Sequence, residues 1–171
     1  MALEHELGET ALNQALSALL AEFKFRSDLY PTTLDLIRHL NAVASPEQQN
    51  YIQDMFAQIT LYDLRATKVT SETLSEGKFK IKLTVSAAKY SADGKGQEDE
   101  QPFEQDVEIA LFSADPNEFG ANNEVIYQGV YALKSGETEL EIIVDKMPSY
   151  AGIDPFVRFI DRDTGNNIIK L

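Results

Sequence analysis

Apolar and polar residues alternate strictly along residues 78–85, and this stretch sets the expected architecture. Phe79, Ile81, Leu83 and Val85 alternate there with lysines and a threonine. In an extended strand, this period of two places the apolar side chains on one face and the ammonium groups on the other. A helix would scatter the same residues around its circumference. The pattern therefore predicts a strand that is covered on one face by other apolar strands and wet on the other, as in antiparallel β layers.

The N-terminal part of the chain carries a helical period instead. Between Met1 and about Phe25, apolar residues recur at steps of three and four residues, which predicts an amphipathic helix. Gly8 interrupts the start of this pattern. Because glycine weakens a helix interior, we expect the firm helix to begin near Glu9 or Thr10.

Two further helices are expected before the strands. Pro31 suits the first turn of the second helix, where its missing N–H does no harm. This helix should stop before Pro46. Ser45 is a favourable N-cap for the third helix, with Gln48 at the third helical position in a capping-box pattern. Residues 1–59 thus predict a segment of about three short helices.

From Thr60 onward the pattern is that of short strands separated by turns. Gly129 suggests a bulge, Ser135-Gly136 a turn, and Thr164-Gly165 a hairpin turn between the last two strands. The expected strands are Leu61–Val69, Lys78 to about Tyr90, Val107–Leu111, Val125–Leu133, Leu140–Val144, Phe156–Ile160 and Asn167–Lys170. This spacing predicts an immunoglobulin-like antiparallel β-sandwich over residues 60–171. With its helices segregated from its strands, the chain is α+β.

Composition narrows the classes of partner. The net charge of -13 disfavours nucleic acid, whose phosphates would be repelled, and equally disfavours an anionic membrane surface. The absence of cysteine excludes disulfides, thiolate metal sites and a cysteine nucleophile. No apolar run reaches the length of a membrane span, so we expect no direct membrane insertion by this segment.

The two histidines bear on a zinc site. His5-Glu6 begins like a zinc-peptidase signature, but Glu9 occupies the place of the second histidine of H-E-x-x-H. His39, beside Arg38, has no partner histidine at helical spacing. We interpret both as surface or boundary histidines, and we expect no metal ligand and no cofactor in this chain.

Two loops are rich in oxygen ligands. Residues 161–167 place oxygens at alternate positions and a glycine at the bend, but the bidentate glutamate of a calcium loop would fall beyond Leu171. Asp115-Pro116-Asn117-Glu118 and Asn122-Asn123-Glu124 also carry carboxylates and amides. A hairpin turn and a solvated loop account for these residues more simply than calcium does.

Motifs of phosphate and nucleophilic chemistry are absent from the sequence. Gly94-Lys95-Gly96 lacks the P-loop spacing and is followed by acidic residues, and no G-x-S-x-G elbow occurs. The sequence therefore offers no catalytic and no cofactor-binding residue.

The remaining charge patterns indicate structure. Glu139 and Glu141 recur at the period of an exposed strand face and mark its solvent side. The lysines of the 78–85 stretch can meet a neighbouring acidic strand, such as that of Asp106 and Glu108, across one face of a sheet.

Several short stretches, spread over nearly the whole chain, together resemble a known bacterial group. They are Phe23-Lys24-Phe25, Tyr30-Pro31-Thr32-Thr33-Leu34-Asp35-Leu36-Ile37-Arg38, Ile59-Thr60-Leu61-Tyr62-Asp63, Lys89-Tyr90-Ser91-Ala92-Asp93-Gly94-Lys95-Gly96 followed by Glu98, Ala151-Gly152-Ile153-Asp154-Pro155, and Ile160-Asp161-Arg162. In this order they are similar to the C-terminal end of large bacterial membrane proteins. Those proteins fuse an ABC-transporter permease-like membrane region to an aminopeptidase N-like (gluzincin) zinc peptidase domain.

The resemblance implies that residues 1–59 are the tail of the peptidase-type helical domain and that residues 60–171 are the terminal non-catalytic module. The family's catalytic residues are the histidines and glutamate of H-E-x-x-H, a downstream glutamate and an assisting tyrosine, and none maps onto a position here. The resemblance therefore implies that zinc is held only in the catalytic domain, elsewhere in a longer, membrane-associated parent. This segment would be a soluble domain of that parent.

Two functional hypotheses follow. The first is an accessory domain that docks on the peptidase domain of its own parent chain or on a partner. Apolar helical faces beyond what the sandwich needs would support it and would drive self-association in isolation. The second is a stand-alone β-sandwich that binds a sugar or a peptide, although sugar platforms need exposed rings and tryptophan is absent. An independent hydrolase has no nucleophile, base or metal set to support it.

Overall fold

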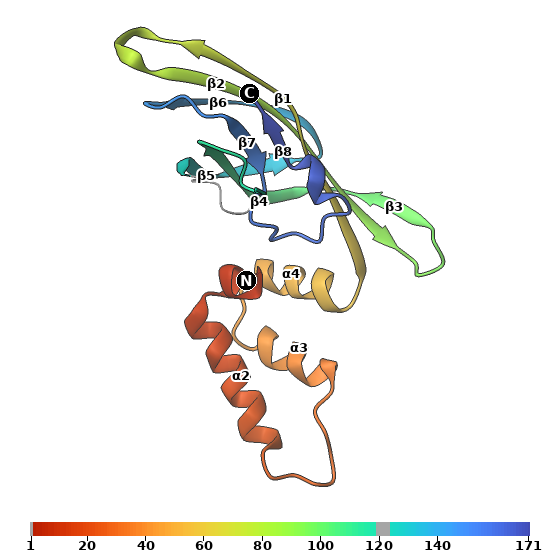
Figure 1. The fold of residues 1–171 in the computed structure, drawn as a ribbon. Helices are drawn as coiled ribbons and strands as arrows, with labels where there is room; N and C mark the ends of the chain where they lie inside the picture. The colour runs from red at the N-terminus through yellow and green to blue at the C-terminus, as the bar shows by residue number, and fades with distance from the viewer. Residues whose placement is uncertain (1, 119–123) are drawn as a thin grey trace. The chain divides into compact units, whose positions relative to one another are not determined.

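The computed structural model describes residues 2–118 and 124–171 and has an α+β architecture. Within these residues, four α-helices precede two antiparallel sheets of four strands each (Figure 1). The chain divides into two compact units, Met1–Thr60 with Ala92–Gln97, and Leu61–Ser91 with Glu98–Leu171. We call them the helical unit and the β unit. None of the described helices is both long enough and apolar enough to cross a membrane.

The helices confirm most of the helical period but divide it differently. Gly8, at φ 80°, separates the short first helix from the second, so the first expected helix is two helices, with the firm one starting at Glu9 as predicted. The left-handed backbone at this position is one that glycine adopts without strain. The helices are α1 (Ala2–Leu7), α2 (Glu9–Phe23), α3 (Thr33–Asn41) and α4 (Pro46–Phe56).

Side-chain caps fix where α3 and α4 begin. The capping box at Ser45 is confirmed, because its hydroxyl accepts a hydrogen bond from the Gln48 N–H at 3.3 Å while its own N–H donates to Gln48 Oε1 at 3.0 Å. The expectation that Pro31 occupies the first turn of a helix is wrong. Thr32 is the N-cap of α3, and its N–H donates to Asp35 Oδ2 at 2.9 Å, so Pro31 lies before the helix.

The helical unit has a small core. Its buried hydrophobic residues are Leu7, Ala15, Leu40 and Ile52, one from each helix. Half-buried residues packed against them include Leu12 and Phe56. Most of the apolar stripe that the helical period predicts is therefore only partly removed from water.

The β unit is organised around β2, the central strand of the first sheet. This strand contains the alternating stretch and pairs with three others, β1, β3 and β6 (Figure 1). The second sheet has the order β5-β4-β7-β8. The strands are β1 (Ile59–Thr73), β2 (Phe79–Ala92), β3 (Glu98–Gln101), β4 (Glu104–Phe112), β5 (Val125–Lys134), β6 (Gly136–Val144), β7 (Tyr150–Ile153) and β8 (Ile168–Lys170).

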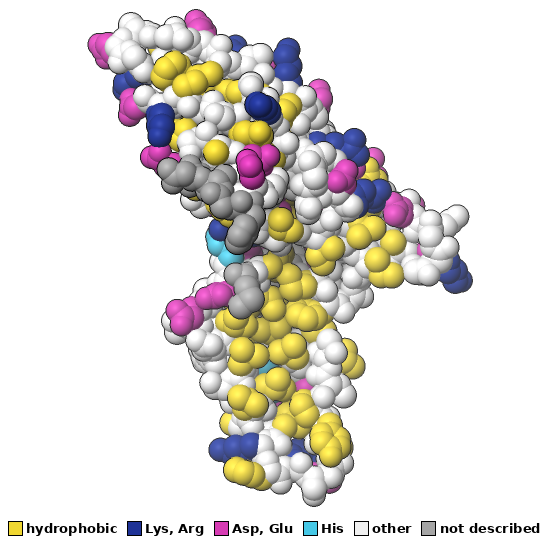
Figure 2. Space-filling view, in the orientation of Figure 1, with side chains coloured by type: hydrophobic (Ala, Val, Ile, Leu, Met, Phe, Trp, Pro, Cys, Tyr) yellow, Lys and Arg dark blue, Asp and Glu magenta, His cyan; other side chains and the backbone are white. Residues whose placement is uncertain are grey.

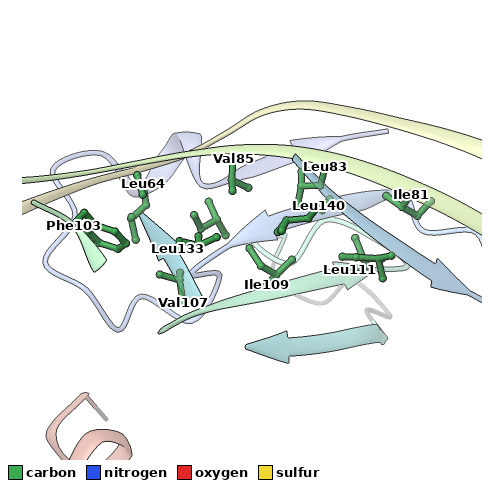
Figure 3. Packing of buried hydrophobic residues seen from close by; sticks show 14 of the residues in the cluster. Leu64, Ile81, Leu83, Val85, Phe103, Val107, Ile109, Leu111, Leu133 and Leu140 are labelled. Carbon is green, nitrogen blue, oxygen red and sulfur yellow. The ribbon is translucent and has the colours of Figure 1, made fainter. Parts of the chain in front are cut away.

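The two sheets share one hydrophobic core (Figure 3). Ile81, Leu83 and Val85 of β2 face this core, as the period of two predicts, and they meet residues such as Ile109 and Leu111 of β4. All five side chains are at most 1% exposed. The wet face of β2, with its lysines, points the other way.

The expected strand at Phe156–Ile160 is wrong. The residues after β7 are irregular, because Asp154 and Val157 have φ angles of 42° and 52°, which no extended strand accommodates. The chain instead forms β7 at Tyr150–Ile153, where no strand was expected. Thr164-Gly165 likewise belongs to a 3₁₀ turn, Thr164–Asn166, and not to a hairpin turn.

Gly129 is not a bulge. It lies in register opposite Ile109, and the irregularity of the β4–β5 pair falls between Leu111 and Phe112. A Cβ at Gly129 would lie 2.9 Å from Cζ of Tyr127, so the aromatic ring occupies the space that a side chain would need.

We predict that Leu83→Ala lowers the free energy of unfolding by about 3 kcal/mol, because the cavity would open between the two sheets. Val130→Ala is the control, since this side chain is 59% exposed and its truncation should cost less than about 1 kcal/mol. Urea unfolding followed by circular dichroism measures both. Equal losses of unfolding free energy in the two variants would show that the core between the sheets does not dominate stability.

Candidate functional site

The histidines do not come together in a metal site. His39 Nε2 lies 2.8 Å from Glu22 Oε2, and the same carboxylate accepts from Arg38 at 2.9 Å. This group ties α3 to α2. His5 lies on α1 and is exposed. Among residues 2–118 and 124–171, no group of three His, Cys, Asp or Glu side chains could hold a metal ion.

The oxygens of the 161–167 stretch are engaged with the protein itself. Asp161 accepts the Leu64 N–H on Oδ2 and the Asp163 N–H on Oδ1, both at 3.0 Å. Asp163 accepts the Gly165 N–H at 3.1 Å and the Asn166 side-chain amide at 3.2 Å. These carboxylates therefore order the loop by capping its backbone.

The second oxygen-rich loop is described only in part. Asp115 Oδ1 accepts the Asn117 N–H at 2.9 Å, an ordinary Asx turn. Glu124 pairs with Lys146. Asn122 and Asn123 lie outside the described residues.

The lysine stripe meets glutamates of β6, and not Asp106 and Glu108 as expected. Those two acids lie on β4, which belongs to the other sheet. Glu141 stands opposite Lys82 in the β2–β6 register. Lys82 Nζ lies 3.0 Å from Glu141 Oε1, which lowers the pKa of Glu141, and Lys80 lies 3.5 Å from its other oxygen.

Glu108 was expected on a solvent-exposed strand face, but the structure buries it. Its side chain is 5% exposed, and its Oε2 lies 2.8 Å from Nη2 of Arg158. Gln128 of β5 donates to the other carboxylate oxygen. The burial arises because the segment after β7 crosses the outer face of β4, where Phe156 also packs on Phe112.

Asp154 holds this crossing segment in place. The side chain is 1% exposed and accepts N–H groups of Arg158 at 2.9 Å and of Phe159 at 3.0 Å. Its own N–H donates to the carbonyl oxygen of Glu108 at 2.8 Å. Burial raises the pKa of Asp154, against the opposing pull of the two N–H groups and the Arg158 charge.

We call Glu108, Gln128, Asp154 and Arg158 the β4 charge cluster. The Arg158–Glu108 ion pair and the Asp154 N–H to Glu108 C=O bond join the crossing segment to β4. Gln128 ties Glu108 to β5, and Asp154 orders the crossing segment itself. Sequence reasoning missed it because strand alternation predicts Glu108 on a wet face. The one signal was the Ile153-Asp154-Pro155 stretch, which is an unusual place for a carboxylate between apolar residues.

Several large hydrophobic side chains of the helical unit are exposed. Figure 2 shows hydrophobic side chains gathered over its helices. We call these residues the helical apolar surface, and they lie on α2, on the α2–α3 connector and at the start of α3. They are Leu16, Leu20, Phe25, Leu29, Tyr30 and Leu34, which are 38–99% exposed.

Comparison with protein-family models, with curated proteins and with solved structures returned no match in any of the three.

We predict that Asp154→Ala lowers the free energy of unfolding by about 3 kcal/mol, because two backbone N–H groups lose their acceptor. Alanine also tolerates the positive φ less well than aspartate or asparagine. Asp154→Asn keeps an acceptor oxygen and should lose less than half as much. Urea unfolding of both variants is the measurement, and equal losses would contradict the capping role.

The raised pKa of Asp154 gives a second prediction. The folded state binds this proton more tightly than the unfolded chain, so the associated stability is present below the ordinary value of 3.8 and is lost as pH rises through the folded pKa. The asparagine side chain of the Asp154→Asn variant does not titrate. As pH rises from about 4 to about 7, the unaltered chain should therefore lose unfolding free energy relative to this variant. Urea titrations across this range test it, and movement in the opposite direction would refute the sign.

Proposed function

We propose that this chain is the non-catalytic C-terminal accessory module of a bacterial, membrane-associated, zinc aminopeptidase-like protein. It docks through the helical apolar surface on the peptidase domain of its parent. Zinc and the bond-breaking residues belong to that domain, and this chain contributes folding and contact surface.

The proposal rests on one observation: the helical unit buries few hydrophobic residues and exposes several large ones. This unit has four buried hydrophobic residues in its core but exposes Leu20, Phe25, Tyr30 and Leu34 at 69–99%. Contiguous exposed apolar surface of this kind marks an interaction site in folded proteins. Covering it with another helical layer would complete a core that the unit begins.

The charges beside this surface also favour an apolar contact. Arg26 pairs with Asp28 at 3.2 Å, and Arg38 pairs with Glu22 at 2.9 Å and with Asp35 at 3.3 Å. Because these charges already have partners within the unit, docking need not leave any of them newly buried and unpaired.

The location of the resemblance supports the same assignment. The stretch from Tyr30 to Arg38 supplies two of the most exposed apolar residues, Tyr30 and Leu34, and also the Thr32–Asp35 cap that fixes the start of α3. The stretch that is similar to the peptidase family thus lies on the surface that we assign to docking.

We also infer that the β unit is an immunoglobulin-like sandwich. Two antiparallel sheets around one core support this, as do the chain crossings from β3 to β4, from β5 to β6 and from β6 to β7 between the sheets.

The test uses the longer gene product. Its upstream peptidase region, produced separately, should bind this chain in titration calorimetry. Leu20→Glu with Leu34→Glu should weaken binding by at least about 10-fold, since two charges would enter an apolar contact. Gln14→Glu with Ala18→Glu adds the same charge on exposed positions away from Leu16 and Leu20 on α2 and should leave affinity unchanged.

Three results would overturn the proposal. One is a longer gene product without H-E-x-x-H upstream of this segment. Another is full binding by the Leu20→Glu, Leu34→Glu variant. The last is this chain alone holding stoichiometric zinc and releasing N-terminal amino acids from a peptide.

A further inference from the structure

The free edge of β6 is a second surface on which a partner could bind. β6 pairs with β2 along one side, and among the described residues no strand pairs with its other side (Figure 1). An edge strand presents a row of unpaired N–H and C=O groups that can accept a further strand.

Charged glutamates are the one edge-blunting device that β6 carries. The strand runs for nine residues, contains no proline and no lysine, and stays in unbroken register with β2 from Val144 to Gly136. Natural edges are more often shortened, bulged or interrupted by proline or lysine. By contrast, β8 at one edge of the second sheet is three residues long.

A row of glutamates lines the wet face of this edge. Glu141 is shared by Lys80 and Lys82, whereas Glu139 lies opposite Thr84 and Glu137 opposite Ser86. The contact of Glu139 with Lys82 is long, at 3.9 Å. Negative charge on β6 is therefore only partly neutralised from the β2 side.

The inner face of the same edge is apolar and belongs to the shared core. Leu140 and Val144 remain 9% and 7% exposed, while Ile81 and Leu83 of the central strand are fully buried. A strand added to β6 would set alternate side chains beside Leu140 and Val144 and extend the shared core by one position.

We propose that the free edge of β6 binds an extended segment of another protein in which basic residues alternate with aliphatic or β-branched residues. The basic side chains pair with Glu137 and Glu139, and the apolar ones cover the inner edge. This is strand addition, in which backbone hydrogen bonds give affinity and alternate side chains give specificity. The inference does not depend on the docking proposed for the helical unit.

The glutamate row also decides against a second copy of this chain. Two β6 edges paired with each other would bring glutamates opposite glutamates, and like charges directly opposite destabilise a strand pair. The same row thus rejects self-pairing and acidic strands and selects a basic one, which is specificity by repulsion and attraction together.

The test titrates the intact chain with fluorescent nine-residue peptides in fluorescence anisotropy. The first alternates lysine with valine, the second replaces each lysine by glutamate, and the third is the lysine peptide N-methylated at every second residue. The lysine peptide should bind at least about 10-fold more tightly than the glutamate peptide at low salt, and salt should narrow this ratio. N-methylation should abolish binding, because it removes the backbone donors of strand addition.

Charge reversal locates the site. Glu137→Lys with Glu139→Lys should lose affinity for the lysine peptide and gain it for the glutamate peptide. Glu100→Lys with Glu118→Lys makes the same change in net charge on exposed residues outside β6 and should change neither preference. Circular dichroism checks that each variant is folded.

The proposal is overturned if the lysine and glutamate peptides bind equally, or if the N-methylated peptide binds as well as its parent. It is also overturned if the control variant loses as much affinity as the β6 variant. A dimer in light scattering that the β6 substitutions dissociate would assign the edge to a second copy instead. The N-methylation arm uses the unaltered chain, so it decides the matter even if a variant fails to fold.

Discussion

The burial of two apolar sheet faces against each other is the constraint on which the rest of the β unit depends. Strand alternation along β2 supplies one side of this core, and β4 supplies the other through Ile109 and Leu111. Once these faces meet, the pleat leaves each strand only its opposite face for polar side chains. The outer face of the first sheet is therefore wet and carries the lysine–glutamate pairs. The outer face of the second is covered by the segment after β7, which is why β4 is buried on both sides.

The polar groups inside the β unit follow from that covering segment. A chain crossing a sheet without strand pairing must find other partners for its backbone, and the Asp154 carboxylate provides them. Glu108 is buried by the same crossing and is compensated by Arg158. The raised pKa of the buried Asp154 carboxyl is, taken by itself, a feature of active-site residues. Its contacts with the N–H groups of Arg158 and Phe159 and with the Glu108 carbonyl instead fasten the crossing segment to β4.

The two proposed surfaces use different physics. The helical apolar surface offers non-directional hydrophobic burial, which supplies affinity and tolerates small changes of geometry. The β6 edge offers directional backbone hydrogen bonds and a charged row, which supply register and selectivity. A module with both surfaces can dock through the helical apolar surface and at the same time bind an extended segment at the β6 edge.

The sequence by itself determined the elements whose pattern is local. The period of two in β2, the helical period before residue 60 and the Ser45 cap all depend on residues within one turn or one strand, and each was predictable from the chain alone. Which strands neighbour each other was decided only by the tertiary structure. The local pattern shows that Lys82 can pair with an acidic residue on a neighbouring strand. It does not show that Glu141, and not Glu108, is that residue. The irregular path after β7 was equally out of reach, because the reason for it, a buried carboxylate gathering N–H groups over β4, exists only once the sheet is assembled.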